Sequence, residues 1–253
     1  LGISIRSCLV KHAVISGGGR GLGLAIAAAF DAEGITTTIL GRDLDRLEQT
    51  VGQLSRTKCM QLNVSDAEAV KSVFAEIGDV DILVNNAGIA PSNPFNMHSV
   101  DDWRNTFAVN VDGAFYCTKA VINKMQERNS GRVINIASTS ALKGYPYVAA
   151  YVSSKHALLG LTRALAAEYA ATDITFNAIC PGFSETDLLT TSLENIVAKT
   201  GRSLDEARRI LASNNPQERF IQPDEVAAIA MWLISDAARS VTGQAICVDG
   251  GET

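Results

Sequence analysis

The chain is poor in the residues that build disulfide frameworks and zinc sites. It contains 5 cysteines and 3 histidines, and the cysteines are widely separated, with no CxxC pair among them. This pattern excludes a disulfide framework and a Cys/His zinc site, so we expect no metal. Scattered thiols are typical of a reducing compartment, and we therefore expect a cytoplasmic protein.

The chain also lacks an excess of positive charge and any long apolar run. The chain has 22 Lys+Arg against 27 Asp+Glu, for a formal net charge of -5. A nucleic-acid binder normally carries a basic excess. The longest apolar run, Val226 to Ile234, is far shorter than the ~20 residues of a membrane-spanning helix. We expect neither a nucleic acid nor a membrane as a partner, whereas a small anionic ligand needs only a few oriented amides and charges.

Short β-rich segments alternate with longer helical segments along almost all of the 253 residues. This alternation predicts βαβ units, which form a parallel sheet with helices on both faces. We therefore expect a single doubly wound, Rossmann-type α/β domain over residues 1–253. Residues 182–217 leave a strand and carry their own amphipathic pattern, so we expect them to form a helical substrate lid. The expected strands span 12–16, 36–40, 58–62, 82–85, 132–137, 175–179 and 245–248, and the expected helices 22–33, 43–54, 66–76, 103–127, 151–169 and 223–235.

A glycine-rich turn lies between the first expected strand and the helix that follows it. Its glycines at Gly17, Gly21 and Gly23 have the spacing GxxxGxG. Glycine lets the backbone turn tightly and approach a ligand without interference from a Cβ. The N-terminus of the following helix offers free amides and a partial positive charge. The turn therefore predicts a pyrophosphate site. The alternative is that its glycines serve only the packing of the strand against the helix.

The end of the second expected strand distinguishes NAD from NADP. An NAD site usually has an acidic residue there, whereas an NADP site has an arginine near the 2′-phosphate. Here the strand is followed by Arg42, with no carboxylate at the first position. Arg42 together with Arg20 is suited to hold a phosphate, which favours NADP(H). NAD(H) stays open, because Asp43 or Asp45 is available for the ribose.

Tyr151 and Lys155 open a helical segment and lie four residues apart, so they share one face of the helix. A phenol titrates near pH 10, too high for efficient proton exchange at neutral pH. A neighbouring ammonium favours the phenolate, and lowering the pKa by ~3 units requires about 4 kcal/mol of differential stabilisation. Ser138 follows the fifth expected strand and is suited to bind the reacting substrate oxygen. These residues predict acid–base chemistry on an alcohol or ketone.

Several motifs occur together in one order along the chain. They are Gly17-x-x-x-Gly21-x-Gly23, Asn85-Asn86-Ala87-Gly88, Asn110, Ser138, Tyr151-x-x-x-Lys155 and Pro181-Gly182. In this order and spacing the sequence resembles the short-chain dehydrogenase/reductase family over nearly its whole length. The resemblance implies an NAD(P)(H)-dependent oxidoreductase that interconverts a secondary alcohol and a ketone by hydride transfer. Within the family the chain is most similar to 3-oxoacyl reductases and 3-hydroxyacyl-CoA dehydrogenases, which implies a 3-hydroxyacyl/3-oxoacyl thioester substrate.

The resemblance also implies a role for each candidate site residue. Tyr151 would be the general acid/base, and Ser138 would polarise the substrate oxygen. Lys155 would lower the pKa of Tyr151 and bind the nicotinamide ribose, while Asn110 would hold a water of the proton relay. Asn63 stands where the family usually has an Asp, and it keeps an acceptor while losing a charge. The further cofactor contacts would be Gly17, Gly19, Arg20, Gly21, Leu22, Gly23, Arg42, Val64, Asn86, Ala87, Gly88, Pro181, Gly182 and Thr186.

The substrate side leaves alternatives open. We expect the pocket to be lined by Ser138, Ser140, Tyr145, Tyr151, Phe183 and Leu188. Tyr145 and Phe183 would suit a free cyclic, aromatic or polyketide alcohol or ketone as well as an acyl chain. An alternative of another class is a cofactor-binding scaffold without catalysis, since fold alone does not dictate function.

Two long helical segments, 103–127 and 151–169, carry apolar residues on more than one face. One sheet cannot cover more than one face of a helix, so a partner copy is expected to cover the rest. The family resemblance implies a two-fold, four-helix interface, and we expect a homotetramer. Trp103 and Trp232 are expected to anchor the core.

Overall fold

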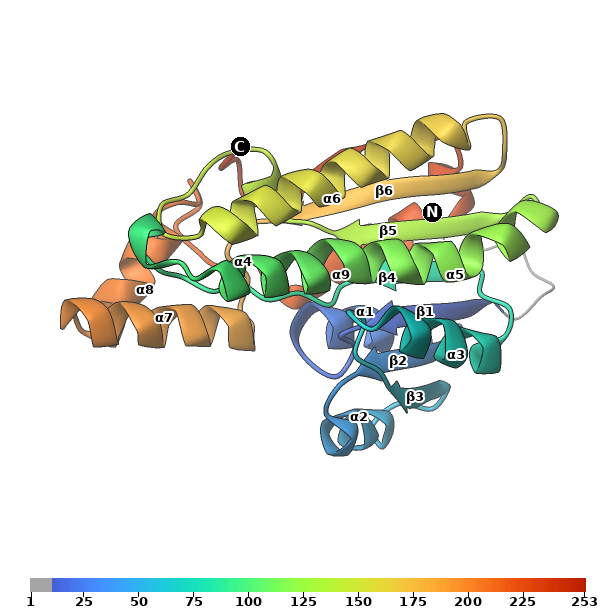
Figure 1. Ribbon diagram of the computed structural model, residues 1–253, viewed down its shortest axis with the longest axis horizontal. Coiled ribbons are helices and arrows are strands. Elements are labelled where there is room, and N and C mark those ends of the chain that lie inside the picture. The colour runs from blue at the N-terminus through green and yellow to red at the C-terminus, as the bar shows by residue number, and fades with distance from the viewer. Residues whose placement is uncertain (1–10) are drawn as a thin grey trace.

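The computed structural model describes residues 11–253 and shows one seven-stranded parallel sheet with helices on both faces (Figure 1). The strand order is β3-β2-β1-β4-β5-β6-β7. All expected strands are present, and the single doubly wound sheet is confirmed. The strands are β1 (His12–Ser16), β2 (Thr36–Gly41), β3 (Thr57–Gln61), β4 (Ile82–Asn85), β5 (Gly131–Ile136), β6 (Ile174–Pro181) and β7 (Ala245–Val248).

The strand order reverses between β1 and β4. The chain proceeds outward from β1 to β3 and then returns to pair β4 with the other side of β1, so that Ser16 lies between Leu40 and Asn85. The connections leaving β1 and β4 diverge at their carboxyl ends. Open α/β sheets bind their ligands at such a point, which places the candidate site at this edge of the sheet.

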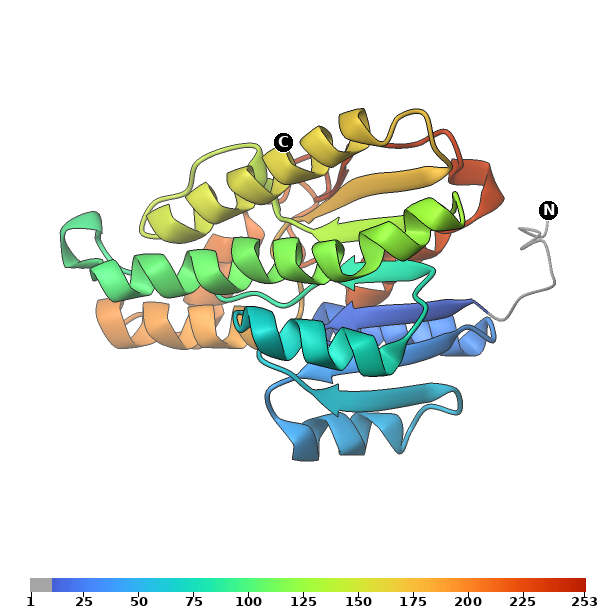
Figure 2. The same cartoon turned by 45° about the vertical axis from the view of Figure 1, so that its right-hand side comes forward.

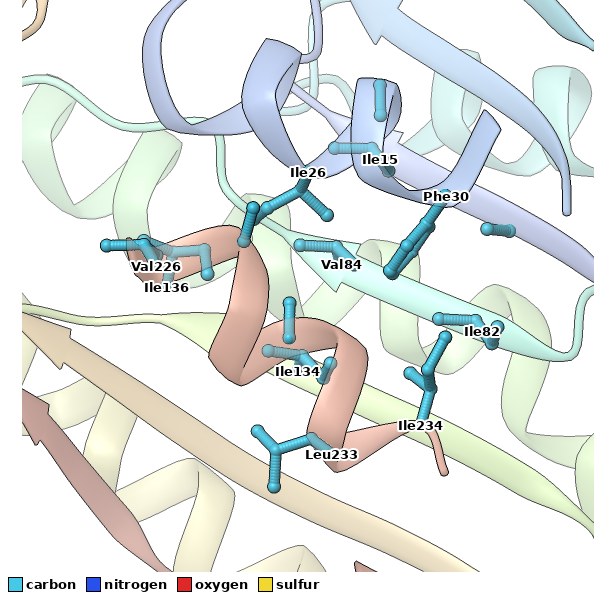
Figure 3. Close-up of a cluster of buried hydrophobic side chains, with 14 of the residues drawn as sticks. Ile15, Ile26, Phe30, Ile82, Val84, Ile134, Ile136, Val226, Leu233 and Ile234 are labelled. Carbon is cyan, nitrogen blue, oxygen red and sulfur yellow. The ribbon is translucent and has the colours of Figure 1, made fainter. Parts of the chain in front are cut away.

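The two faces of the sheet carry separate apolar cores. Helices α1 (Gly21–Ala32) and α9 (Pro223–Leu233) cover one face, where Phe30 is fully buried among isoleucines of the strands (Figure 3). Helices α3 (Ala67–Ile77), α5 (Gly113–Glu127) and α6 (Ala149–Glu168) cover the other (Figure 2). Helix α2 (Leu44–Val51) lies at the β3 edge. Because every central strand is buried on both faces, the strands are nearly continuous apolar runs.

Side-chain caps fix where several helices begin. The Asp43 carboxylate accepts a hydrogen bond from the Arg46 amide at 3.1 Å, and the Asp66 carboxylate accepts two from the first turn of α3. Ser203 forms a capping box with Glu206 at the start of α8 (Leu204–Ala212). These caps satisfy amides that have no partner inside the helix.

The expected helix over 103–127 is helical throughout but contains a π-helical turn. It begins earlier, as α4 (Val100–Phe107), and a π-helical turn over Ala108–Asp112 joins it to α5. The prediction that Trp103 anchors the core was wrong: it is 42% exposed and stacks on Phe107, with ring centroids 4.9 Å apart. The reason is position, because α4 lies near the edge of the fold, where the sheet does not cover it (Figure 1).

Residues 182–217 form two helices, α7 (Asp187–Thr200) and α8, beyond the carboxyl ends of the strands (Figure 1). Leu189 and Leu193 of α7 are buried with Ala207 and Phe220 in a small core of their own, whereas Leu188 is exposed. The two helices therefore pack as a unit, and their closing over a substrate stays a prediction. Within residues 11–253, no helix has the length and apolarity needed to cross a membrane.

Candidate active site

The glycine turn between β1 and α1 is built by close backbone approach. Gly17 and Gly21 have positive φ angles of 66° and 54°, which favour glycine. A Cβ at Gly23 would collide with the Gly17 carbonyl oxygen, and one at Gly18 would collide with Ile39. The turn therefore requires glycine at these positions, and it leaves the N-terminal amides of α1 at the ligand edge of the sheet.

Ser16 and Asn86 hold this turn in place. The Asn86 side-chain amide donates to the carbonyl oxygens of Ser16 and Gly17, at 3.1 and 2.9 Å. The Ser16 hydroxyl accepts from the backbone amides of Asn86 and Ala87, at 3.0 and 3.1 Å. Asn86 was predicted as a cofactor contact, and the structure shows that it also joins the end of β4 to the glycine turn.

Lys155, Asn110 and Gly88 come together behind the turn. A Cβ on Gly88 would lie 3.4 Å from Asn110 Oδ1 and 3.6 Å from Lys155 Nζ. Lys155 is only 4% exposed, and its Nζ donates to the Ile136 carbonyl oxygen at 2.7 Å. Burial lowers the pKa of Lys155 from 10.5 to about 8, because a low-dielectric environment disfavours the ammonium.

The Asn110 side chain, in the π-helical turn, binds protein groups. Its amide nitrogen donates to the Ile89 carbonyl oxygen and the Ser154 hydroxyl, each at 2.9 Å, and its Oδ1 accepts from the Ile89 amide at 2.9 Å. Both amide protons are thereby used. A relay water can reach this side chain only as a donor to the second lone pair of Oδ1, so that role stays a prediction.

Tyr151 lies one helical turn before Lys155, and the Lys155 Nζ is 5.6 Å from the centre of its ring. Burial raises the pKa of Tyr151, while the neighbouring Ser138 side chain opposes the rise. Desolvation therefore dominates the pKa of Tyr151 in the protein by itself, and its lowering by Lys155 stays a prediction. The contact between Tyr151 and Ser138 does place the two predicted catalytic hydroxyls side by side.

The predicted arginine pair is arranged differently from the expectation. Arg20 forms an ion pair with Asp187, the first residue of α7, at 3.2 Å, and Arg46 joins the same carboxylate at 2.9 Å. Arg42 is exposed at the end of β2, where its carbonyl oxygen accepts from Gln61. Arg20 and Arg46 thus meet at one carboxylate beside the glycine turn, and the sequence patterns did not single out Arg46. Its signal was its place in the first turn of the helix that follows β2.

The remaining predicted cofactor residues lie along the same edge. A Cβ on Gly21 would lie 3.2 Å from Thr186 Cγ2, so the glycine turn touches the segment that begins the lid. Gly182 donates its amide to the Val248 carbonyl oxygen at 3.0 Å, directly after the buried Pro181. Asn63 is exposed and accepts from the Ser65 amide and hydroxyl, while Val64 is 6% exposed. Gly19 and Leu22 lie within the glycine turn and the first turn of α1.

Comparison with known proteins agrees with this arrangement. A family model described as enoyl-(acyl carrier protein) reductase matches residues 17–253. The chain is 34% identical to the 3β-hydroxysteroid dehydrogenase of Mediterraneibacter gnavus, over 96% of this chain and 95% of that protein. It is 34% identical to the D-β-hydroxybutyrate dehydrogenase of Cupriavidus necator, over 95% and 97%. It is 32% identical to the 3-oxoacyl-[acyl-carrier-protein] reductase of Staphylococcus aureus, over 96% and 98%.

The chain belongs to the short-chain dehydrogenase/reductase family. Solved structures support the same assignment. Actinorhodin polyketide ketoreductase with NADPH superposes with a TM-score of 0.92 at 33% identity, covering 96% of this chain and 97% of that one. ElxO with NADP gives a TM-score of 0.86 at 29% identity, covering 96% and 99%.

The predicted substrate residues of this short-chain dehydrogenase/reductase differ in burial and in their contacts. Tyr145 packs edge-on against Phe183, with ring centroids 6.2 Å apart and an interplanar angle of 85°. Ser140 is 5% exposed, and its amide donates to the Ser138 hydroxyl oxygen at 3.1 Å, so it supports Ser138. Leu188 is 43% exposed at the start of α7. Tyr145 and Phe183 thus pack against each other, and the Tyr145 hydroxyl lies 2.7 Å from Oγ1 of Thr139, the residue after Ser138.

We predict that Lys155→Met changes how stability depends on pH. The folded pKa of Lys155 is about 8 against 10.5 ordinarily, so between these values the unfolded state binds more protons. The free energy of unfolding of the wild type should therefore rise relative to that of the variant as pH increases through this window. Urea unfolding at neutral pH and at about pH 10 measures the difference. The exposed Lys71→Met should show no such trend, and a wild-type–Lys155→Met difference that does not change with pH would contradict the burial argument.

Proposed function

We propose that the chain is an NADP(H)-dependent oxidoreductase that interconverts a secondary alcohol and a ketone, with 3-hydroxyacyl/3-oxoacyl thioesters as its substrate class. The observation that carries this proposal is the meeting of Ser138, Tyr151 and the buried Lys155 beside the glycine turn. The names of the S. aureus reductase and the C. necator dehydrogenase support the reaction type.

The residues present fit a dinucleotide. Helix α1 has no side-chain cap and no acidic residue in its first turn, so its amides are available to a pyrophosphate. The glycine turn brings its backbone into close contact with its neighbours, where a Cβ atom would collide, so its amides are open to a ligand. Arg20, Arg42 and Arg46 supply positive charge for a 2′-phosphate, and the solved ketoreductase and ElxO hold NADPH and NADP. When bound, the nicotinamide supplies or accepts the hydride at the substrate carbon.

The chain's own residues handle the proton. In reduction, the Tyr151 hydroxyl gives its proton to the substrate oxygen while the Ser138 hydroxyl donates a hydrogen bond to the same oxygen. In oxidation, Tyr151 takes the proton back. Lys155, fixed by the Ile136 carbonyl oxygen, is placed to stabilise the phenolate and to bind the nicotinamide ribose. Asn110, through Ile89 and Ser154, holds the segments on either side of this lysine.

A free cyclic or aromatic alcohol is the second candidate substrate class. The edge-on pair of Tyr145 and Phe183 favours it, because such a wall suits a flat apolar ring. The hydroxysteroid dehydrogenase and the polyketide ketoreductase among the similar proteins are named for ring-bearing or polyketide substrates. Steady-state assays with a 3-oxoacyl thioester and a cyclic ketone would rank the two classes by kcat/KM.

We also propose a cytoplasmic homotetramer. Cys59, Cys117, Cys180 and Cys247 are free thiols, in keeping with a reducing compartment. On α4 and α5, Trp103 and Phe115 are 42% and 45% exposed, and partner helices would cover them. The closed symmetric arrangement that the family resemblance implies would bury this face in a two-fold interface.

Tyr151→Phe should abolish turnover and leave cofactor binding within a few-fold of wild type. The variant keeps the ring and loses the proton, so the loss falls on the transition state; general acid–base catalysis contributes about 100-fold or more. Ketone reduction by the purified variant measures this, with Tyr169→Phe at the far end of α6 as the control. A variant that kept a tenth of wild-type kcat/KM would exclude Tyr151 as the acid/base.

Arg42→Ala should raise the KM for NADPH by about tenfold or more and change the KM for NADH little, because a charged phosphate contact is worth roughly 1.5–3 kcal/mol. Initial rates at varied cofactor concentration measure this. The exposed Arg56→Ala, on the loop before β3, is the matched control. A wild-type enzyme that preferred NADH in a side-by-side assay would overturn the NADP assignment.

Light scattering should give a mass of about four times the 26.9 kDa of one chain. Phe115→Asp places a charge on the exposed face of α5 and should shift the mass downward, because burying an unpaired carboxylate in the interface is costly. A wild-type mass of 26.9 kDa at micromolar concentration would show that the helices carry no partner copy.

A further inference from the structure

Glu252, the second residue from the C-terminus, extends its side chain into the protein beside the candidate active site. The side chain is only 1% exposed. It lies between the loop that follows Ser138 and the end of β6, where a Cβ on Gly182 would be 3.1 Å from Glu252 Oε2. Nothing in the sequence patterns singled this residue out.

One carboxylate oxygen of Glu252 is the centre of a small polar network. Its Oε1 accepts a short hydrogen bond from the Tyr145 hydroxyl and forms an ion pair with Lys143 Nζ at 3.1 Å. The same Lys143 Nζ also donates to the Glu252 carbonyl oxygen at 3.0 Å and lies 5.2 Å from the centre of the Tyr145 ring. Glu252 therefore binds two residues of one loop.

The network continues from Tyr145 to the residue next to Ser138. The Tyr145 hydroxyl lies 2.7 Å from Thr139 Oγ1. A phenol has one proton, and the carboxylate is the stronger acceptor, so Tyr145 donates to Glu252 and the Thr139 hydroxyl donates to the Tyr145 oxygen. Burial together with the Glu252 carboxylate raises the pKa of Tyr145, which keeps the phenol protonated and able to donate. Thr139 is thereby tied to Glu252 through Tyr145.

The same arrangement fixes the wall of the candidate pocket. The Tyr145 ring is held at its hydroxyl by Glu252 and Thr139, and its edge packs against Phe183. Phe183 follows Gly182, at the beginning of the segment that leads to α7. Glu252 therefore joins the Ser138 loop to the start of the predicted lid.

Stability alone does not account for a carboxylate at this position. Among residues 11–253, Glu252 Oε2 is one of the few buried side-chain atoms with no hydrogen-bond partner. Leaving such an atom unpaired costs free energy, and a buried polar atom without a partner calls for an explanation other than stability.

We propose that Glu252 is a positioning residue for the active site, which sets the place of Tyr145 and of the Ser138 loop and thereby the substrate selectivity. The inference rests on the proposed oxidoreductase function. Glu252 thus positions residues of the Ser138 loop, such as Tyr145, which lies 107 residues earlier in the sequence.

The test compares Glu252→Met and Glu252→Gln with wild type, using a small and a bulky ketone with NADPH. Glu252→Met should lower Tm, because it leaves the Tyr145 hydroxyl and Lys143 without their acceptor. It should also lower kcat/KM by about tenfold or more and change the ratio of kcat/KM between the two ketones. The NADPH Kd should change far less than kcat/KM, because the hydrogen bonds of the Glu252 side chain go to Lys143 and Tyr145, and it approaches the predicted cofactor residues at Gly182. Glu252→Gln should recover part of the loss, since its amide oxygen still accepts from Tyr145.

A double-mutant cycle with Tyr145→Phe tests whether Glu252 acts on the kinetics through Tyr145. Because both changes break the same contact, the double variant should be no worse than the poorer single variant. Asp79→Asn serves as the control. Asp79 forms an ion pair with Lys124, with 2.9 Å between Oδ1 and Nζ, and the pair lies far from the ligand edge, so this variant should leave the ketone ratio unchanged.

Three results would overturn the inference. They are unchanged kinetics in Glu252→Met, an equal loss for both ketones that follows the loss of Tm, and losses that multiply in the double variant. If Glu252→Met fails to fold, the ketone ratio of Glu252→Gln decides, and a wild-type ratio there also overturns it. Tyr151→Phe in the same assay separates this outcome from failure of the proposed function, because an active Tyr151→Phe would overturn the function itself.

Discussion

A single buried ammonium organises the active site. Lys155 is 4% exposed, and its Nζ donates a hydrogen bond to the carbonyl oxygen of Ile136, the last residue of β5. Burying a charge is costly unless it is satisfied, so this contact requires α6 to cross the sheet at the end of β5. Tyr151, one turn earlier on α6, is then placed beside Ser138, which follows β5 two residues later. The pair of catalytic hydroxyls is thus a geometric consequence of where the lysine is held.

The surrounding contacts make this arrangement rigid. The π-helical turn between α4 and α5 turns Asn110 inward, where it joins Ile89 to Ser154 on α6. Such turns occur often at functional sites because they redirect a side chain without ending the helix. On the other side, Asn86 ties the glycine turn to β4. The glycine turn and the predicted proton-transfer residues are therefore each held by hydrogen bonds of an asparagine side chain, Asn86 and Asn110.

The sequence predicted what depends on local chemistry. Strand and helix alternation gave the sheet, and the glycine spacing, Tyr151 and Lys155 gave the ligand edge, since each pattern lies within one or two turns of the chain. It did not predict contacts between distant segments. Arg20 meets Asp187 across 167 residues, and Tyr145 meets Glu252 across 107. Nor did it predict the π-helical turn or the exposure of Trp103, because both depend on how helices pack against the rest of the fold.

The central claim is that Tyr151 becomes an effective acid/base when Lys155 and the bound cofactor act on it together, since burial alone raises its pKa. The most direct test is a spectroscopic titration of phenolate absorbance, in wild type and Tyr151→Phe, with and without saturating NADP⁺. We expect one additional phenolate in the wild type, titrating about 2–3 units below the usual value of 10 and only when NADP⁺ is bound. Identical titrations of the two proteins, or a wild-type phenolate that forms only near pH 10 in the complex, would contradict it.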